Sequence, residues 1–262
     1  MKDFVNQRWA DILRHNGLMD FDTLWNLDAG WFEAPNQRRG GWSGVSRCEL
    51  SLPQQGSRGV FLKRQENHKT FSWRHPINGI PTFLREFRLI MHYKACGIPA
   101  LEPVYFAQRV VAGGHRAILV TEELAGFTSL ESQVQDWLKN GFPPATALRQ
   151  YLQAVAVLSR RIHANKIQHN CYYPKHIFVR MAPEGGVDAR VIDLEKSRRR
   201  PLSLLCTLRD LDTLNRHAPE FSRKDRLRFL KSYLGIGRLG PYAKWLWRRL
   251  AARALAKSGA GA

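Results

Sequence analysis

The sequence predicts an α+β protein of two lobes, a strand-rich first lobe and a helical second lobe. Between about residues 22 and 125, short strand-like runs alternate with turn signals around a single helical stretch. From about residue 130 the pattern is helical and contains only two short strand-like runs. We therefore expect residues 1–124 to form the first lobe and residues 125–262 the second, with a linker near Leu124–Thr128.

The first lobe is predicted from its strands in chain order and from one helix. The helix is expected over PTFLREFRLIMHYKACG, where apolar residues recur with helical spacing and Gly97, followed by Pro99, gives a stop signal. The strand-like runs are WFEA, VSRCELSL, VFLKRQ, PVYFAQRVV and RAILVTEEL.

The second lobe is predicted from its helices and one hairpin. Ser129 is a candidate cap for a short helix, and residues 143–164 read as a long amphipathic helix that opens with prolines. Two strands, HIFVR and ARVIDLE, follow on either side of MAPEGGVD. Arg209–Asp212 is expected to start a further helix, with a structural role.

Composition favours a cytoplasmic protein with an anionic partner. No run has the roughly 18–20 apolar residues of a membrane-spanning helix, and the N-terminal residues lack the apolar core of a signal peptide. The four cysteines form no C-x-x-C pair, which argues against a zinc cluster or a disulfide framework. The net charge of +19 fits nucleic acid, anionic lipid or phosphorylated glycolipid, although a generic basic surface explains it as well.

The basic charge is concentrated in the last third of the chain. Residues 244–257, KWLWRRLAARALAK, read as a helix in which Trp245 and Leu250 stand among basic residues. Such a helix is compatible with an anionic membrane surface. It is equally compatible with docking on its own domain, and the sequence leaves both interpretations open.

The order and spacing of these segments resemble the protein-kinase-like fold. Lys63, in VFLK, resembles the lysine that holds nucleotide phosphates, and Glu86, in LREF, resembles the glutamate that pairs with this lysine. Gly41 and Gly44 resemble part of a glycine-rich phosphate loop, although a hairpin turn explains them equally well. Glu122, just before the linker, completes the nucleotide-binding candidates.

More narrowly, the chain resembles the bacterial lipopolysaccharide core kinases, the Kdo kinase and WaaP-type heptose kinase family with its InaA-like branch. The segments that carry this resemblance span about residues 30–215: FLK, PTFLRE, GIPALEP, Ile162–His163, His169 with His176-Ile177-Phe178, and Ile192–Asp193-Leu194. The resemblance implies phosphate transfer from ATP, with Mg²⁺, to a sugar of lipid-linked core oligosaccharide or another anionic glycolipid. It also implies a location at the cytoplasmic face of the inner membrane, with peripheral contact to anionic lipid.

The catalytic loop departs from the kinase pattern H-R-D-L-x-x-x-N. His169 keeps the histidine, Cys171 stands where the catalytic aspartate is expected, and His176 takes the position of the metal-binding asparagine. Asp193 matches the metal-binding aspartate of the D-F-G motif, although a turn or helix-cap aspartate is an alternative. The resemblance thus implies catalytic roles at His169, Cys171 and Asp193, and a metal site at Asp193 and His176.

Without the catalytic aspartate, three functions have to be weighed: a slower kinase, a pseudokinase and a nucleic-acid-binding protein. General-base catalysis typically contributes about 10²–10⁴-fold, and phosphoryl transfer depends mainly on positioning and charge neutralisation, so a kinase without this aspartate is slowed but not excluded. Lys175 and His169 are candidates to assist, although the spacing places neither of them at the substrate. The alternative is a pseudokinase or stress-linked accessory protein of envelope assembly. Nucleic acid would require a recognisable reader motif or aromatic residues stacked on a basic sheet, and it is not expected.

Overall fold

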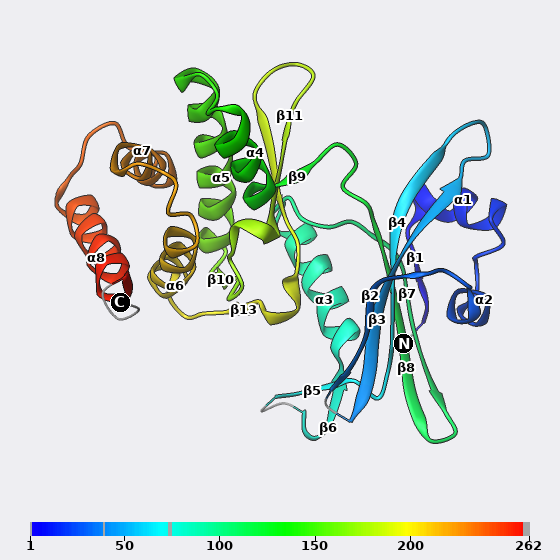
Figure 1. Ribbon diagram of the computed structural model, residues 1–262. Coiled ribbons are helices and arrows are strands. Elements are labelled where there is room, and N and C mark those ends of the chain that lie inside the picture. Colours follow the sequence, from blue (N-terminus) through cyan, green and yellow to red (C-terminus); the bar gives the residue numbers. More distant parts are fainter. Residues whose placement is uncertain (1, 39, 73–74, 259–262) are drawn as a thin grey trace. The chain divides into compact units, whose positions relative to one another are not determined.

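The computed structural model describes residues 2–38, 40–72 and 75–258. The chain divides into two compact units, Met1–His92 with Leu101–Ala125, and Tyr93–Ala100 with Gly126–Ala262. The first is rich in strands and the second in helices (Figure 1), which confirms the predicted α+β fold class. Residues 93–100, predicted to belong to the first lobe, pack with the second unit.

The first unit is built on a six-stranded antiparallel sheet (Figure 1) in the order β1-β7-β8-β4-β3-β2. A separate two-stranded sheet pairs β5 with β6. The strands are β1 Phe4–Val5, β2 Trp31–Arg38, β3 Gly41–Ser51, β4 Ser57–Glu66, β5 Lys69–Ser72, β6 His75–Pro81, β7 Pro103–Val111 and β8 Gly114–Glu122. The helices are η1 Gln7–Trp9, α1 Ala10–His15, α2 Phe21–Asn26 and the first part of α3 Thr82–Ala95.

The two faces of this sheet carry different helices. Side chains of α1 and α2, among them Leu13 and Phe21, form one core with Leu62 of β4 and Tyr105 of β7. Because successive strand residues point to opposite faces, Lys63 and Phe106 face the other way. There Phe87 of α3 stacks on Phe106, with ring centroids 4.5 Å apart. The helix α3 therefore covers the face that carries Lys63.

The boundaries of α3 follow the predicted signals. The backbone N–H of Phe83, in the first turn, donates to the side-chain oxygen of Gln65 at 2.7 Å. At the other end Gly97 has a positive φ of 64°, and the N–H of Ile98 returns to the carbonyl of Tyr93 at 3.0 Å. A glycine in the left-handed region after the last turn ends a helix without strain. The predicted helix and its stop signal are confirmed.

The second unit consists of five α-helices, a three-stranded sheet in the order β12-β11-β9 and the strand pair β10-β13, counted over the described residues. Its apolar core joins Ala156 of α5 to Leu211, Leu230, Tyr233 and Leu246 of the later helices. The helices are α4 Leu130–Asn140, α5 Ala145–Ala164, α6 Ser203–Arg216, α7 Arg223–Leu234 and α8 Pro241–Ser258, with two short 3-10 turns, η2 Pro174–His176 and η3 Leu194–Lys196. The strands are β9 Thr128–Ser129, β10 Ile167–Gln168, β11 Ile177–Met181, β12 Val187–Val191 and β13 Arg198–Arg199.

Two sequence predictions in this unit are confirmed. The hydroxyl of Ser129 accepts the backbone N–H of Ser132 at 3.0 Å and so caps α4. The antiparallel hairpin of β11 and β12 places Ile177, which follows the predicted catalytic loop, opposite Val191, which lies two residues before Asp193. Within the described part of the chain, no helix combines the length and apolarity needed to cross a bilayer.

Candidate functional site

The lysine and glutamate predicted to act together form an ion pair in the first unit. Lys63 Nζ lies 2.6 Å from Glu86 Oε1, and the two side chains are 17% and 3% exposed. Lys63 comes from β4 and Glu86 from α3, on the same face of the sheet. A carboxylate buried to this degree needs a cationic partner, and the pairing fixes a flexible ammonium group in one place without solvent reorganisation.

The two candidate glycines lie in β3, and their packing accounts for the absence of a side chain. A Cβ on Gly41 would clash with the backbone carbonyl of Glu66, and one on Gly44 would meet the ring of Trp31 at 2.5 Å. Gly41 is therefore required for space within the sheet, whereas a side chain at Gly44 would require the partly exposed Trp31 ring to move. Their role toward phosphate stays a prediction.

Glu122 ends β8 in the first unit. Its backbone N–H donates to the carbonyl of Glu102 at 2.9 Å, and its carboxylate lies 4.0 Å from the guanidinium of Arg58. Both groups are partly exposed, so this ion pair contributes little to stability. A nucleotide role for Glu122 stays a prediction.

In the second unit, the segment around His169 is fixed by a buried carboxylate. Asp210, in α6, is fully buried. Its two oxygens accept the backbone N–H groups of His169 at 2.7 Å and Asn170 at 3.0 Å. The ring of His163, in α5, adds a third contact at 3.3 Å. Asp210 therefore holds the loop that carries His169 and Cys171 against two helices.

This anchoring role agrees with the structural role predicted for Arg209–Asp212, but the helix start predicted there is wrong. Those residues do not start a helix; they lie in the second half of α6, which begins at Ser203. Leu208 and Leu211, on either side of Asp210, pack in the helical core. The available signal was an aspartate within an apolar helical stretch, because a buried carboxylate requires partners. Its partners lie about 40 residues earlier in the chain and could not be identified from spacing.

The ring of His169 is buried and neutral. Nε2 lies 2.9 Å from the carbonyl of Ile192, so we assign its proton to Nε2. Burial lowers the pKa of His169, although the carboxylate of Asp210 acts in the opposite direction. Nδ1 is buried without a hydrogen-bond partner among the described atoms. A neutral ring donating to Ile192 links the catalytic loop to the end of the hairpin, immediately before Asp193.

Asp193 and His176 are brought together at the end of that hairpin. Asp193 Oδ2 lies 3.5 Å from His176 Nδ1, and the carboxylate is about one third exposed. Asp193 adopts left-handed backbone angles, φ 57° and ψ 56°, and its side chain makes no cap hydrogen bond to the following turn. Asp193 therefore directly precedes the turn η3 without capping it through its side chain, and the turn-aspartate alternative stays open. Left-handed non-glycine residues cluster at functional sites.

This pair meets one requirement of a magnesium site. Carboxylate oxygen is the ligand type that Mg²⁺ prefers, and the ion usually takes its other ligands from water and substrate phosphates. His176 Nδ1 lies 2.8 Å from the Cys171 carbonyl, so we assign its proton to Nδ1, with Nε2 as the lone-pair nitrogen. No group of three or more His, Cys, Asp or Glu suited to a metal occurs among the described residues. Asp193 therefore fits Mg²⁺ as a single carboxylate ligand.

Cys171 is 7% exposed, and its backbone carbonyl accepts the hydrogen bond from the ring of His176. Burial raises the pKa of its thiol, and the nearby Asp193 carboxylate raises it further. The ordinary cysteine pKa is about 8.5, so the thiol stays protonated at neutral pH. A protonated thiol cannot accept the proton that a catalytic aspartate accepts in an active kinase.

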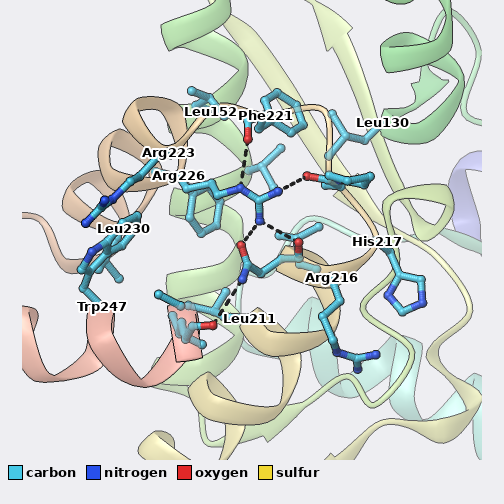
Figure 2. A pocket seen from close by; sticks show the side chains of 18 of the residues that line it. Leu130, Leu152, Leu211, Arg216, His217, Phe221, Arg223, Arg226, Leu230 and Trp247 are labelled. Carbon is cyan, nitrogen blue, oxygen red and sulfur yellow. Dashed lines mark hydrogen bonds between the residues drawn. The ribbon is translucent and has the colours of Figure 1, made fainter. Parts of the chain in front are cut away.

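The second unit also contains a large cavity between α5, α6, α7 and α8, shown in Figure 2. Its volume is about 740 Å³, and apolar side chains such as Leu152, Leu211 and Trp247 form most of its lining. The guanidinium of Arg226 projects among them and donates to the carbonyls of Phe221 and Ala218. Further basic side chains, Arg216, His217 and Arg223, line it as well. Pockets of 300–1,000 Å³ with apolar linings commonly bind small molecules.

Comparison with known sequences relates most of the chain to one family. The model of the lipopolysaccharide kinase (Kdo/WaaP) family matches residues 22–233. Protein InaA of Escherichia coli K12 is 36% identical over 184 residues, which are 69% of this chain and 80% of InaA. The lipopolysaccharide core heptose(I) kinase WaaP of E. coli K12 is 28% identical, and that of Pseudomonas aeruginosa PAO1 is 29% identical. The matches span 63% and 58% of those two WaaP proteins, and 63% and 57% of this chain.

Comparison with solved structures gives the same fold. WaaP in complex with acyl carrier protein superimposes with a TM-score of 0.70 over 99% of this chain and 98% of that chain. The two sequences are 22% identical. The strand-rich and helical units described above are therefore those of the WaaP fold.

Proposed function

Because the chain belongs to the lipopolysaccharide kinase (Kdo/WaaP) family, we propose that it transfers phosphate from ATP to a sugar of the lipopolysaccharide core, at the cytoplasmic face of the inner membrane. The observation that carries this proposal is the Lys63–Glu86 ion pair at 2.6 Å. A lysine held by a buried carboxylate is one of the two arrangements that kinase catalysis requires; the other is an aspartate that holds the metal.

The proposed roles follow from the chemistry of each group. Lys63 neutralises charge on the nucleotide phosphates, and Glu86 keeps the ammonium in position. Asp193 ligates Mg²⁺, with the ring of His176 beside it. The bound metal supplies positive charge that stabilises the phosphoryl group during transfer. His169 orients the end of the hairpin through its hydrogen bond to Ile192.

In this proposal Cys171 contributes no general base. Its raised pKa keeps the thiol protonated at neutral pH. The sugar hydroxyl then loses its proton late, to the transferred phosphate or to water, which a largely dissociative transition state tolerates. The expected cost is about 10²–10⁴-fold in rate relative to a kinase that has the aspartate.

The protonated thiol of Cys171 favours a second candidate function, an accessory pseudokinase of envelope assembly. A chain that binds nucleotide without catalysis needs no general base, so a buried thiol in place of the aspartate would cost it nothing. The two functions differ in turnover, because only the kinase consumes ATP when the sugar acceptor is present.

Thermal unfolding with Mg-ATP tests whether either function involves nucleotide. A ligand that binds only the folded chain adds RT ln(1 + [L]/Kd) to its stability, so the melting temperature should rise with free Mg-ATP. Lys63→Met should reduce the shift, whereas Lys139→Met, a change of the same charge at an exposed position of α4, should leave it unchanged. No shift for the wild-type chain at millimolar Mg-ATP would overturn the kinase proposal.

We further propose an acyl carrier protein as partner, because the apolar cavity of the second unit can hold a hydrocarbon chain. Each buried methylene contributes about 0.8 kcal/mol. Acylated carrier protein should therefore raise the melting temperature more than carrier protein without the acyl group, and increasingly so with chain length. Filling the cavity with Leu214→Trp should remove the difference. Equal shifts from both forms of the carrier would contradict an acyl-chain site.

A further inference from the structure

The helix α8 has one face in the core and a second face of aromatic and basic side chains. Ala243, Leu246 and Leu250 are buried at 3%, 0% and 7% exposure, so the helix is docked on its own unit. Tyr242 and Trp245, three residues apart, are 52% and 44% exposed. The helix is therefore docked on its own unit, as one of the two interpretations of the sequence expected, and it still exposes aromatic side chains.

The exposed aromatic pair is ordered. The rings of Tyr242 and Trp245 stack with centroids 5.9 Å apart and an interplanar angle of 26°. Residues three apart on a helix share a face, so the pair presents one continuous aromatic surface. An indole and a phenol ring prefer the boundary between water and hydrocarbon, because each has an apolar body and a polar tip.

The side chains around the pair are basic. Lys244, Arg248 and Arg249 of α8 are exposed, and so is Arg238 in the loop before the helix. From Arg226 to Ala262 the sequence has nine lysine and arginine residues and neither aspartate nor glutamate. The charge on this face is therefore not balanced by carboxylates from its own segment.

We infer that this face of α8, made of Arg238, Tyr242, Lys244, Trp245, Arg248 and Arg249, docks on an anionic phospholipid surface. Aromatic side chains among lysine and arginine are the pattern of helices that lie in the membrane interface. Basic residues near a membrane gain attraction from its anionic lipids. The aromatic pair enters the headgroup region, and the basic side chains contact lipid phosphates. The inference gives the proposed kinase a means of reaching a lipid-linked acceptor, but it rests on α8 and not on catalysis.

Vesicle sedimentation tests the inference directly. The wild-type chain should bind vesicles containing about 30% phosphatidylglycerol and not vesicles of phosphatidylcholine, and added salt should weaken binding because the attraction is electrostatic. The double variant Arg248→Glu/Arg249→Glu should bind at least about tenfold more weakly, and Trp245→Ala about fivefold more weakly. The matched control Lys139→Glu/Arg149→Glu makes the same change in charge at exposed positions of α4 and α5 and should bind as the wild type does.

Two further measurements separate the possible outcomes. Brominated phosphatidylglycerol should quench tryptophan fluorescence of the wild-type chain, and Trp245→Phe should lose most of that quenching. Lys63→Met should bind vesicles normally, so a failure of the kinase proposal leaves this result unchanged.

Equal losses in the α8 and control variants, or no binding by the wild type, would overturn the inference. So would loss of acyl carrier protein binding in the α8 variant without loss of vesicle binding. Circular dichroism checks that each variant is folded.

Discussion

The carboxylate of Asp210 accepts the backbone N–H of His169 at 2.7 Å, in a fully buried position. One residue of α6 thereby sets the backbone of the loop in which Cys171 replaces the aspartate expected of a kinase. Position 171 carries a thiol in place of a carboxylate, but Asp210 still fixes the backbone that would present a catalytic aspartate. The loop is therefore organised independently of the residue it carries.

Asp210→Ala is expected to lower the free energy of unfolding by about 2–4 kcal/mol, because two backbone N–H groups would be buried without acceptors. Asp136→Ala, in α4, is the matched control. Asp136 is exposed and accepts a side-chain hydrogen bond from Asn140 at 2.7 Å, so its loss should cost less than about 1 kcal/mol. Urea denaturation followed by circular dichroism measures both. Equal costs would show that Asp210 does not have the anchoring role assigned to it.

The Lys63–Glu86 pair should behave as a coupled unit. Lys63→Met would leave Glu86, only 3% exposed, without its cation and should destabilise the chain by about 2–4 kcal/mol. Glu86→Gln in the same chain should recover part of that loss, because an amide is less costly to bury than a charge. A double-mutant cycle in urea gives the coupling energy. Additive effects would mean that the ion pair does not form in solution.

Cys171 should be replaceable without loss of activity. If the thiol is protonated and accepts no proton, Cys171→Ala should change the rate of phosphate transfer less than about threefold, a small part of what a general base contributes. Cys171→Asp should instead raise the rate by about tenfold or more, because it restores a carboxylate at that position. A loss of more than tenfold in Cys171→Ala would assign the thiol a chemical role that this account denies.

The chain should lose stability in mildly acidic solution through His169. Burial lowers its pKa, so below the ordinary histidine value of about 6.5 the unfolded chain binds a proton that the folded chain does not. Stability therefore falls as the pH drops below that value, by at most about 1.4 kcal/mol per pH unit for one proton. His169→Gln keeps a donor for Ile192 and cannot titrate. Urea titrations between pH 7.5 and 5.5 should show a shallower decline for this variant; an unchanged slope would contradict the buried, neutral ring.

Local patterns predicted the elements of the fold but not its long-range contacts. The α3 helix, its stop at Gly97 and the cap at Ser129 depend on neighbouring residues, and all three are confirmed. The segment that follows α3 is different. Ala100 pairs with Val191, and the N–H of Val191 donates to Pro99 at 3.3 Å. These partners are about 90 residues apart, and no local pattern specifies the pairing.

The candidate site was predictable only to the extent that a resemblance supplied its residues. The resemblance supplied Lys63, Glu86 and Asp193, and the structure then gave the 2.6 Å ion pair and the left-handed aspartate. Their catalytic roles stay predictions. The partners of Asp210 were missed because they are backbone N–H groups about 40 residues earlier in the chain, which no local pattern specifies. The close contacts of Gly41 and Gly44 also depend on how neighbouring segments pack in the sheet, which the sequence does not show.

The most direct test of the central claim is a single-turnover measurement of phosphate transfer from Mg-ATP to isolated lipopolysaccharide core acceptor, with the wild-type chain, Lys63→Ala and Asp193→Asn compared. We expect slow, acceptor-dependent transfer by the wild type. We also expect a fall of at least about 100-fold in each variant, because each removes charge that stabilises the transferring phosphate. Equal background rates in all three proteins would contradict the central claim and leave the accessory pseudokinase as the function of this chain.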